Sequence, residues 1–328
     1  MEVFASAFKT PRPGVVIVGA GAMGRALGLR LAEAGYPVRG VVSRSRTSAE
    51  ALARAVGAPV ATDRLGEIPA DAPLVALCVP DDQLADLAET LTGAHRSWQG
   101  AVVLHTSGAL PASVLDPLRG EGARTLSFHP LQSVTRDADA QTLAGATVGV
   151  EGSEPGRAAG IELAVGLGMR YLVVSTEAKP RYHLAAAMAS NLLVTLMAIV
   201  QEVLASIDID RAEAMSILEP LLRGTIDNLL ATSPEEALTG PVARGDLATL
   251  KSHGLSLRKD LPHLVPVYAA LSVETVRLAV RSGSLAPERA EEVLSLMQRM
   301  VTTPLPGTTE AAAERPPAPS RAVWTASS

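Results

Sequence analysis

The sequence has 328 residues and contains a single cysteine, Cys78, which lies in an apolar run. One thiol excludes an intrachain disulfide framework and is typical of the reducing cytoplasm, where we expect this protein to reside. Acidic and basic residues are also nearly balanced, since 29 basic and 34 acidic residues give a net charge of only -5. That balance gives no reason to expect nucleic acid as a partner.

Long hydrophobic runs are missing as well. Residues 1–13 include Glu2, Lys9 and Arg12 and have no extended apolar core, so we expect no secretory signal. The most apolar stretch, residues 184–200, is interrupted by polar side chains (Ser190, Asn191 and Thr195). It falls short of the roughly 18 unbroken apolar residues of a membrane span. We therefore expect a buried helix there and no membrane partner.

What the sequence does contain begins with residues 15–31, VVIVGAGAMGRALGLRL. A β-branched run typical of a buried strand leads into the G-x-G-x-x-G spacing of Gly19, Gly21 and Gly24, and a helical pattern follows. Gly19 permits the tight turn, Gly21 lets a pyrophosphate approach the backbone, and Gly24 lets the helix pack closely. The helix N-terminus offers N–H groups to phosphates. We expect a dinucleotide to bind at residues 19–24, which also include Ala22 and Met23.

A purely structural glycine turn is the alternative to that coenzyme site. The strand before the glycines and a second strand expected at residues 38–42 favour the site, because a dinucleotide motif belongs between a strand and a helix. An NAD site usually carries an acidic residue at the end of the second strand. This chain has Ser43, Arg44 and Arg46 there instead, and a guanidinium matches a 2′-phosphate. We therefore predict NADP(H), with a solvated loop as the alternative interpretation.

The remaining pattern predicts an α/β fold, a doubly wound parallel Rossmann sheet followed by an all-α C-terminal domain. The expected strands are residues 15–18, 38–42, 60–62, 74–79, 101–104, 125–128, 146–150 and 170–174. The turns that follow several of them meet at the carboxyl edge of the sheet, which makes Val79, Pro80 and Ser107 candidates for the coenzyme site. Asp82 is a candidate N-cap for the helix after the fourth strand.

From Lys179 onward the chain shows only helical periodicity. Pro180 suits the first turn of a long helix that ends near Ser206, and further helices are expected at residues 211–230, 246–261, 265–282 and 287–301. The predicted division is an N-terminal extension (1–13), an NADP-binding Rossmann domain (14–176), a helical substrate and dimerisation domain (177–303) and a disordered Pro/Ala-rich tail (304–328). Because the helical domain is so apolar, we expect a homodimer through it.

The long helix also carries the candidate catalytic groups. His183, Ala187, Ser190 and Asn191 share one face, and the alanines leave room for a ligand. Histidine titrates near neutrality, so His183 could donate the proton to a forming alcohol or amine, while Asn191 would orient the substrate or the nicotinamide amide. Both residues could instead be satisfied core polar groups. A zinc site built from the histidines (His105, His129 and His183) lacks zinc-ligand spacing, and we expect no metal.

A second polar constellation is LTGPVARGD, residues 238–246, a turn between helices. Arg244 could hold a substrate carboxylate in a two-bond fork. Asp246 is more simply explained as the cap of the next helix. Ser107 and His129, on two strand-end loops, are further candidates for the wall of the site.

With these residues in view, the chain resembles a family of Rossmann-like oxidoreductases with an all-helical, formerly uncharacterised C-terminal domain. The resemblance rests on GAGAMG, VPDDQL (79–84), HTSGAL (105–110), SFHPLQS (127–133), YHLAAAMASN (182–191) and LTGPVARGD (238–246). The family is similar to the pyrroline-5-carboxylate reductases and the 6-phosphogluconate-dehydrogenase-like enzymes. Some members act as alternative ketopantoate reductases in pantothenate and coenzyme A synthesis. That resemblance implies NADPH hydride transfer to the ketone of 2-dehydropantoate.

Better-known ketopantoate reductases place a lysine on the opening face of the long helix, where this chain has His183, with Lys179 one turn earlier. Both residues are therefore candidate proton donors. The leading hypothesis is an NADPH-dependent reductase of a small 2-keto acid carboxylate, with ketopantoate as the named substrate. The alternatives are a cyclic-imine (pyrroline-5-carboxylate-type) reductase and a non-catalytic NADP(H)-binding regulatory protein.

Overall fold

The computed structural model describes residues 12–94 and 96–302, and its contacts divide the chain into two units, Met1–Leu193 and Val194–Ser328. We call these the sheet unit and the helical unit. Most of the predicted N-terminal extension and the whole predicted tail lie outside the described residues. The predicted domain boundary at residue 176 follows the last strand, whereas the contacts keep the next helix with the sheet. Lys179 and Tyr182 of that helix bond to strand residues, which explains its place in the sheet unit.

The sheet unit contains all eight predicted strands in one sheet, in the order β3-β2-β1-β4-β5-β6-β7-β8. Their bounds are β1 Val15–Val18, β2 Val38–Val42, β3 Val60–Thr62, β4 Leu74–Leu77, β5 Val102–His105, β6 Arg124–Pro130, β7 Thr147–Glu151 and β8 Arg170–Val173. The first six strands run parallel to one another. Strand β7 pairs antiparallel with β6, and β8 runs parallel to β7. The predicted doubly wound parallel sheet is therefore confirmed for β1 to β6, and the antiparallel pairing of β7 with β6 departs from it. The link between β6 and β7 holds only the 3-10 turn η4, Ala140–Leu143, in place of the crossover helix that usually joins parallel strands.

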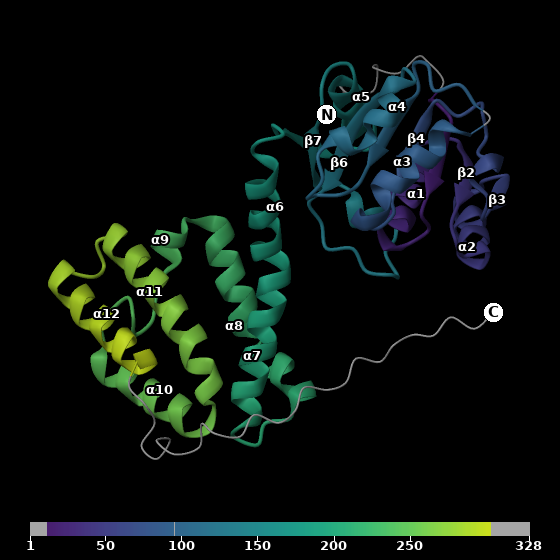
Figure 1. Cartoon of the computed structure of the whole chain (residues 1–328). Coiled ribbons are helices and arrows are strands. Elements are labelled where there is room, and N and C mark those ends of the chain that lie inside the picture. Colours follow the sequence, from purple (N-terminus) through teal and green to yellow (C-terminus); the bar gives the residue numbers. More distant parts are fainter. Residues whose placement is uncertain (1–11, 95, 303–328) are drawn as a thin grey trace, which may run out of the picture. The chain divides into compact units, whose positions relative to one another are not determined.

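Helices cover both faces of this sheet (Figure 1). Along β1, Val15 and Ile17 join the core beneath α1 (Ala22–Glu33), α2 (Arg46–Val56) and α5 (Gly156–Gly166). Val16 and Val18 point the other way, into the core beneath α3 (Leu84–Thr92) and α4 (Asp116–Gly120). This alternation follows from the two-residue period of a strand, and it accounts for the continuous apolar run seen in the sequence.

The predicted N-cap at Asp82 is wrong. Asp82 lies within the 3-10 turn η2, Asp81–Gln83, and α3 begins after Gln83 without a side-chain cap. The chain therefore enters α3 through a tight backbone turn, and Asp82 lies one residue before the N-cap position of the helix.

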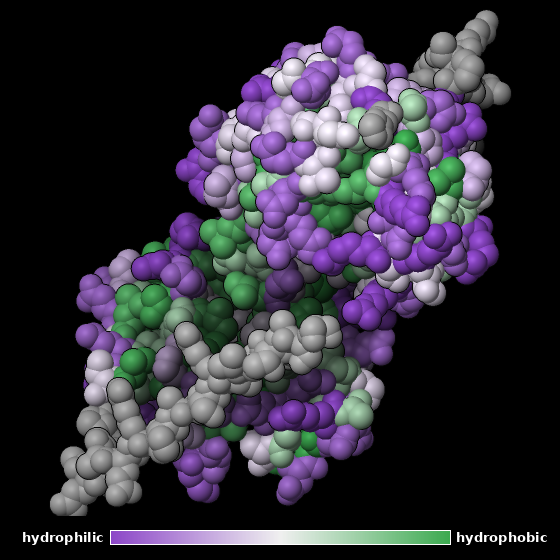
Figure 2. Space-filling view, turned by 45° about the vertical axis from the view of Figure 1, so that its right-hand side comes forward, coloured by the Kyte–Doolittle hydropathy of each residue, from purple (hydrophilic) through white to green (hydrophobic). Residues whose placement is uncertain are grey.

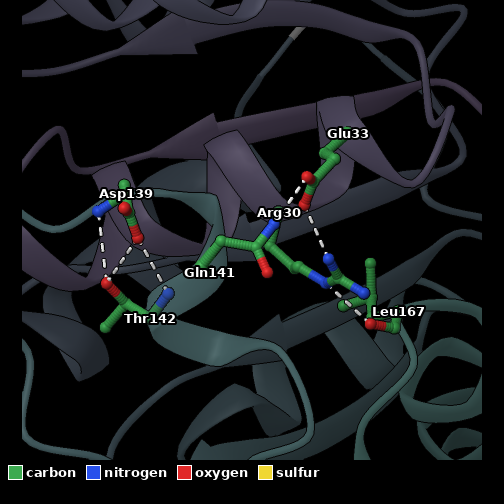
Figure 3. Close-up of polar contacts among 6 residues, drawn as sticks. All are labelled: Arg30, Glu33, Asp139, Gln141, Thr142 and Leu167. Carbon is green, nitrogen blue, oxygen red and sulfur yellow. Dashed lines mark hydrogen bonds and ion pairs between the residues drawn. The ribbon is translucent and has the colours of Figure 1, made fainter.

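Side chains tie α1 to segments that come more than a hundred residues later (Figure 3). Arg30 donates from Nε to the carbonyl oxygen of Leu167 at 2.7 Å and pairs with Glu33 at 2.6 Å. Glu33 in turn accepts from the Gln141 amide at 2.7 Å. These contacts hold the β7–β8 extension against the helix that follows the glycine turn.

The long helix after the sheet is continuous but not uniform. It runs as α6 (Lys179–Ala187), a π-helical turn η5 (Met188–Leu192) and α7 (Leu193–Ala205), close to the predicted span. The sequence did not reveal the π turn. Such turns occur often at functional sites, because the extra residue changes which side chains face a given direction.

The helical unit continues with α8 (Arg211–Ala231), α10 (Leu247–Asp260), α11 (Val265–Arg281) and α12 (Pro287–Thr302), all close to the predicted ranges. The short α9, Pro234–Ala237, was not predicted, because four residues show no periodicity. Asp246 caps α10 as expected, accepting from the Thr249 backbone N–H at 3.1 Å. The core of this unit draws on residues 242–300, mainly on α10, α11 and α12.

Two helical stretches, Lys179–Ala205 and Pro262–Arg281, are long and apolar enough to cross a membrane, which alone is weak evidence for a span. None of the most apolar window in Lys179–Ala205 is buried in the single chain. The prediction of a buried helix is therefore wrong for the isolated chain. The physical reason is that α7 adds no buried side chain to the core of the helical unit, and α8 has only Ala214 buried.

We expect Gly24→Ala to destabilise the sheet unit by at least about 2 kcal/mol, despite the better helix propensity of alanine. A Cβ at Gly24 would overlap the carbonyl oxygen of Gly19. Gly21→Ala is the matched control, since a Cβ at Gly21 meets nothing within 4 Å. Thermal unfolding of both variants measures the effect, and equal stabilities would contradict the close packing of α1 on the turn.

Candidate active site

The carboxyl ends of β1, β2 and β4 enclose a cavity of about 540 Å³. It lies where the strand order reverses, which is the place where open α/β sheets bind ligands. Its polar and turn-forming lining includes Gly19, Gly21, Ser43, Arg44, Ser45, Ser48, Asp63, Val79 and Pro80. We call it the coenzyme cavity because the predicted dinucleotide-binding residues gather there.

The glycine turn has the geometry that a pyrophosphate requires. Gly19 has φ of 103°, a conformation that L side chains rarely adopt, and a Cβ there would also overlap the backbone of Cys78. Gly21 is the N-cap residue of α1, and the space where its Cβ would stand is open. The first N–H groups of α1 are therefore accessible to an anion, and the residues present fit a dinucleotide.

The coenzyme cavity separates the predicted phosphate-binding residues into two groups. Ser43 and Arg44 line it, together with Ser45, whose Oγ accepts from the Ser48 backbone at 3.2 Å and caps α2. Arg46 does not line it, because its Nε bonds to Glu50 at 3.1 Å on the exposed side of α2.

Ala22, Met23 and Gly24 form the start of α1 beside the coenzyme cavity and are not among its lining residues. Ser107 is also outside that lining. It is buried, and its Oγ accepts from the backbone of Ala109 and Leu110 at 3.2 and 3.0 Å, so its hydroxyl shapes its own turn. Asp63 lines the cavity but was missed, although it directly follows β3 on the same edge of the sheet.

A second cavity, of about 640 Å³, lies at the carboxyl end of β6 and along α6 and the π turn. We call it the substrate cavity. Its lining residues are His129–Ser133, Leu172, Tyr182, His183, Ala185–Ala187, Ala189, Ser190 and Asn191. The predicted face of the long helix is thus gathered at one cavity wall, with alanines between the polar groups.

His129, Tyr182 and His183 form a cluster within this wall. The Tyr182 hydroxyl lies 2.9 Å from His129 Nδ1, and the rings of His129 and His183 are 5.9 Å apart in an edge-to-face arrangement. Burial, followed by the charges of Lys179 and His183, lowers the pKa of His129 to about 4. Burial raises the pKa of Tyr182 to about 12. Near neutral pH, His129 is therefore a neutral imidazole beside a protonated phenol.

Lys179 occupies a different place from His183. It is only 2% exposed, and its Nζ donates to the Oγ of Ser127 on β6 at 2.6 Å. Burial lowers its pKa from 10.5 to about 8, against the opposing effect of the Glu151 and Asp81 carboxylates. Lys179 does not line the substrate cavity, whereas His183 does.

Two further ionisable groups lie buried near Lys179. Glu151 accepts from the Ala112 backbone at 2.6 Å and from the Thr176 hydroxyl at 2.8 Å. His105 is fully buried, and burial, with the charge of Lys179, lowers its pKa to about 3. The proximity of Lys179, Glu151 and His105 was not predicted, because they come from distant segments of the chain.

The predicted carboxylate ligand, Arg244, belongs to the helical unit, where it is exposed on the turn before α10. Within residues 12–94 and 96–302, no three His, Cys, Asp or Glu side chains are placed to hold a metal ion.

Two known family models match this sequence, one in its N-terminal part and one in its C-terminal part. Residues 2–130 match the Rossmann-like domain, and residues 146–275 match a domain of unknown function, DUF2520. The first half of the chain is thus similar to the Rossmann-like domain and much of the second half to DUF2520. None of the curated proteins matches the sequence.

Solved structures are similar to this chain over most of its length. A Bacteroides fragilis protein described as an NADP oxidoreductase has 25% identity and a TM-score of 0.67, over 81% of this chain and 98% of that one. A Thermotoga maritima protein has 25% identity and a TM-score of 0.60, over 87% and 100%. An imine reductase from Myxococcus stipitatus, solved with NADP+, has 20% identity and a TM-score of 0.53, over 88% and 94%, and shares the fold. The fold is that of the Rossmann-type NAD(P)-dependent oxidoreductases.

We expect the wild-type protein to gain roughly 1–3 kcal/mol of stability relative to Lys179→Met between about pH 8 and pH 10.5. In this window the unfolded chain binds a proton on Lys179 that the folded chain does not, so stability rises with pH. Urea unfolding of both proteins at a series of pH values measures the difference. Parallel stability curves would show that Lys179 is not held in a desolvated site.

Proposed function

We propose that the protein is an NADPH-dependent oxidoreductase that reduces a small 2-keto acid, with 2-dehydropantoate (ketopantoate) as the named substrate and pantoate as its product. The observation that carries the proposal is the placement of both cavities on the carboxyl edge of the parallel strands. One contains the glycine turn and Arg44, and the other contains His183. Asp81 adjoins the coenzyme cavity at Pro80 and acts electrostatically on His129 of the substrate cavity, so the two sites are close.

The coenzyme assignment rests on two features of its cavity. Gly19 and Gly21 leave the α1 N-terminus open to the pyrophosphate, and Arg44 with Ser43 and Ser45 offers a guanidinium and hydroxyls to a 2′-phosphate. The NADP oxidoreductase of B. fragilis supports the same choice. Bound NADPH supplies the hydride.

The residues of the chain would supply the proton and the orientation. Reduction of a ketone adds a hydride to the carbonyl carbon and a proton to its oxygen. His183 gives that proton and regains one from solvent, since its side chain is only half-buried. Lys179, enclosed beneath the cavity, is placed to support the wall. Asn191 orients the substrate.

The family resemblance of the motifs at residues 127–133, 182–191 and 238–246 supports ketopantoate as the substrate. The observed cavity is compatible with it, because the alanines of α6 leave space for a compact branched acid. The free, buried Cys78 is compatible with the reducing cytoplasm that we propose as the location of the protein.

We expect purified protein to oxidise NADPH in the presence of ketopantoate and to prefer NADPH over NADH. His183→Ala should lower kcat by roughly 100-fold or more, because a general acid contributes that much. Arg44→Ala should raise the KM for NADPH by roughly 10-fold or more, because a charge-assisted hydrogen bond is lost. The absorbance of the reduced nicotinamide reports all three quantities.

Arg46→Ala is the matched control, since Arg46 is paired with Glu50 outside the coenzyme cavity. A cyclic imine belongs in the same assay. Turnover of the imine alone would replace the 2-keto acid by that substrate class. Tight NADPH binding without turnover of any carbonyl or imine would instead identify a regulatory protein.

We also propose a homodimer through the helical unit. Hydrophobic residues, green in Figure 2, reach the surface of this unit. On α7 and α8 they include Val194 (69% exposed), Leu221 (66%) and Leu230 (82%). Large apolar side chains exposed in number on two helices favour an association site, and a second copy would cover them.

Sedimentation should give a mass twice that of the chain, and Leu221→Glu should shift the protein towards monomer. Leu255→Glu is the control, because Leu255 is equally apolar and 70% exposed but lies on α10. A monomeric wild-type protein would rule the dimer out.

A further inference from the structure

We propose that His129 is a second catalytic residue, which directs an Nε2–H group at the carbonyl oxygen of the substrate, and that Tyr182 is the positioning residue that fixes this tautomer. The inference rests on the proposed function and narrows it. A site with such a donor takes a carbonyl compound in preference to a protonated iminium ion.

The position of His129 follows from the sheet. It is the penultimate residue of β6, where the strand reaches the carboxyl edge, and it pairs with Gly149 of the antiparallel β7. Its ring lines the substrate cavity, 5.6 Å from the ring of Tyr182 and 5.9 Å from that of His183. A substrate oxygen that receives a proton from His183 is therefore within reach of His129 as well.

The hydrogen bonds of Tyr182 decide which nitrogen of His129 carries the proton. The Tyr182 hydroxyl lies close against Gly149, since a Cβ on that glycine would overlap it. The phenol has one proton to donate, and its oxygen lies 2.9 Å from His129 Nδ1 but 3.3 Å from the His129 carbonyl oxygen. We assign the phenol proton to the shorter contact. Nδ1 is then an acceptor, and the neutral ring carries its hydrogen on Nε2.

Two glycines make room for this arrangement. A Cβ on Gly149 would overlap the Tyr182 hydroxyl, so only glycine lets the phenol reach the strand. A Cβ on Gly108 would lie 2.7 Å from His129 Nε2 and 2.6 Å from His183 Cδ2. Gly108 therefore lets the Nε2 edge of His129 and the His183 ring share one space beside the loop after β5.

The surroundings keep His129 neutral. Lys179 and His183 on α6 oppose a positive charge on the ring, as does His105 on β5, while Asp81 on η2 favours one and Tyr182 is uncharged. With burial, these effects hold the pKa of His129 well below neutrality. A neutral imidazole donates a hydrogen bond without surrendering its proton. His129 and His183 thus divide the work, since one stabilises the developing oxyanion and the other protonates it.

This division has a consequence for the substrate. A carbonyl oxygen has lone pairs that accept from Nε2–H, and the bond strengthens as negative charge develops during hydride arrival. A protonated iminium nitrogen carries hydrogen and has no lone pair, so it cannot accept a hydrogen bond from His129 Nε2–H. The cavity therefore favours the 2-keto acid over the protonated cyclic imine.

The test combines tautomer and turnover. Long-range 1H–15N NMR of the substrate-free protein should show His129 protonated at Nε2, and this signature should disappear in Tyr182→Phe. We expect His129→Ala to lower kcat with the keto acid by roughly 100-fold, Tyr182→Phe by roughly 10-fold, and His129→Asn, which retains an N–H donor, to recover part of the loss. KM for NADPH should remain unchanged.

Tyr268→Phe is the matched control. Tyr268 makes the same pair with His253, at 2.9 Å and with ring centroids 5.8 Å apart, within the helical unit. Its loss should leave kcat unchanged. Protonation of His129 at Nδ1, or full turnover by His129→Ala, would overturn the inference while leaving the reductase intact. An Nε2–H tautomer in a wild-type protein that turns over no carbonyl would instead refute the proposed function.

Discussion

The hydrogen bond between Lys179 and Ser127 anchors the start of α6 to the end of β6, and the geometry of the substrate cavity depends on it. A buried ammonium group needs a partner, because an uncompensated charge away from water is costly. Ser127 accepts that bond, and its own hydroxyl donates a hydrogen bond to the Ser107 carbonyl oxygen at 3.1 Å. With the first turn held in this way, the next residues of α6 face the carboxyl edge of the sheet.

The two cavities use different physical means to prepare for their ligands. In the coenzyme cavity, Gly19 and Gly21 have no side chain and so leave backbone N–H groups open to an anion, and Arg44 adds a positive charge to the lining. In the substrate cavity, burial and neighbouring positive charge keep the His129 imidazole neutral, and α6 contributes alanines that leave space for a ligand. An anionic coenzyme and a small polar substrate would thus meet on one edge of the sheet. Each site is formed by short local segments that the parallel strands bring together.

The antiparallel turn at β7 is what completes the substrate cavity. Because β7 runs back along β6, Gly149 lies opposite His129, and Tyr182 can bond to His129 while its hydroxyl lies close against the glycine. A seventh strand running parallel would pair a different residue with His129. The departure from a wholly parallel sheet is therefore part of the site, and it explains why a chain that otherwise follows the Rossmann pattern ends its sheet differently.

The sequence by itself determined the features that depend on neighbours along the chain. Periodicity identified the strands and the long helices, the spacing of Gly19, Gly21 and Gly24 identified the phosphate turn, and the face with His183 and Asn191 followed from helical geometry. These features are local, because backbone conformation and the periods of strand and helix set them.

Only the tertiary structure decided the direction of β7, the burial of Lys179, the exposure of α7 and the bond from Tyr182 to His129. Each of these depends on which distant segments pack together. Residues 129, 149 and 182 have no relation in the sequence, and they meet because hydrogen bonds of the sheet align two strands beneath one helix.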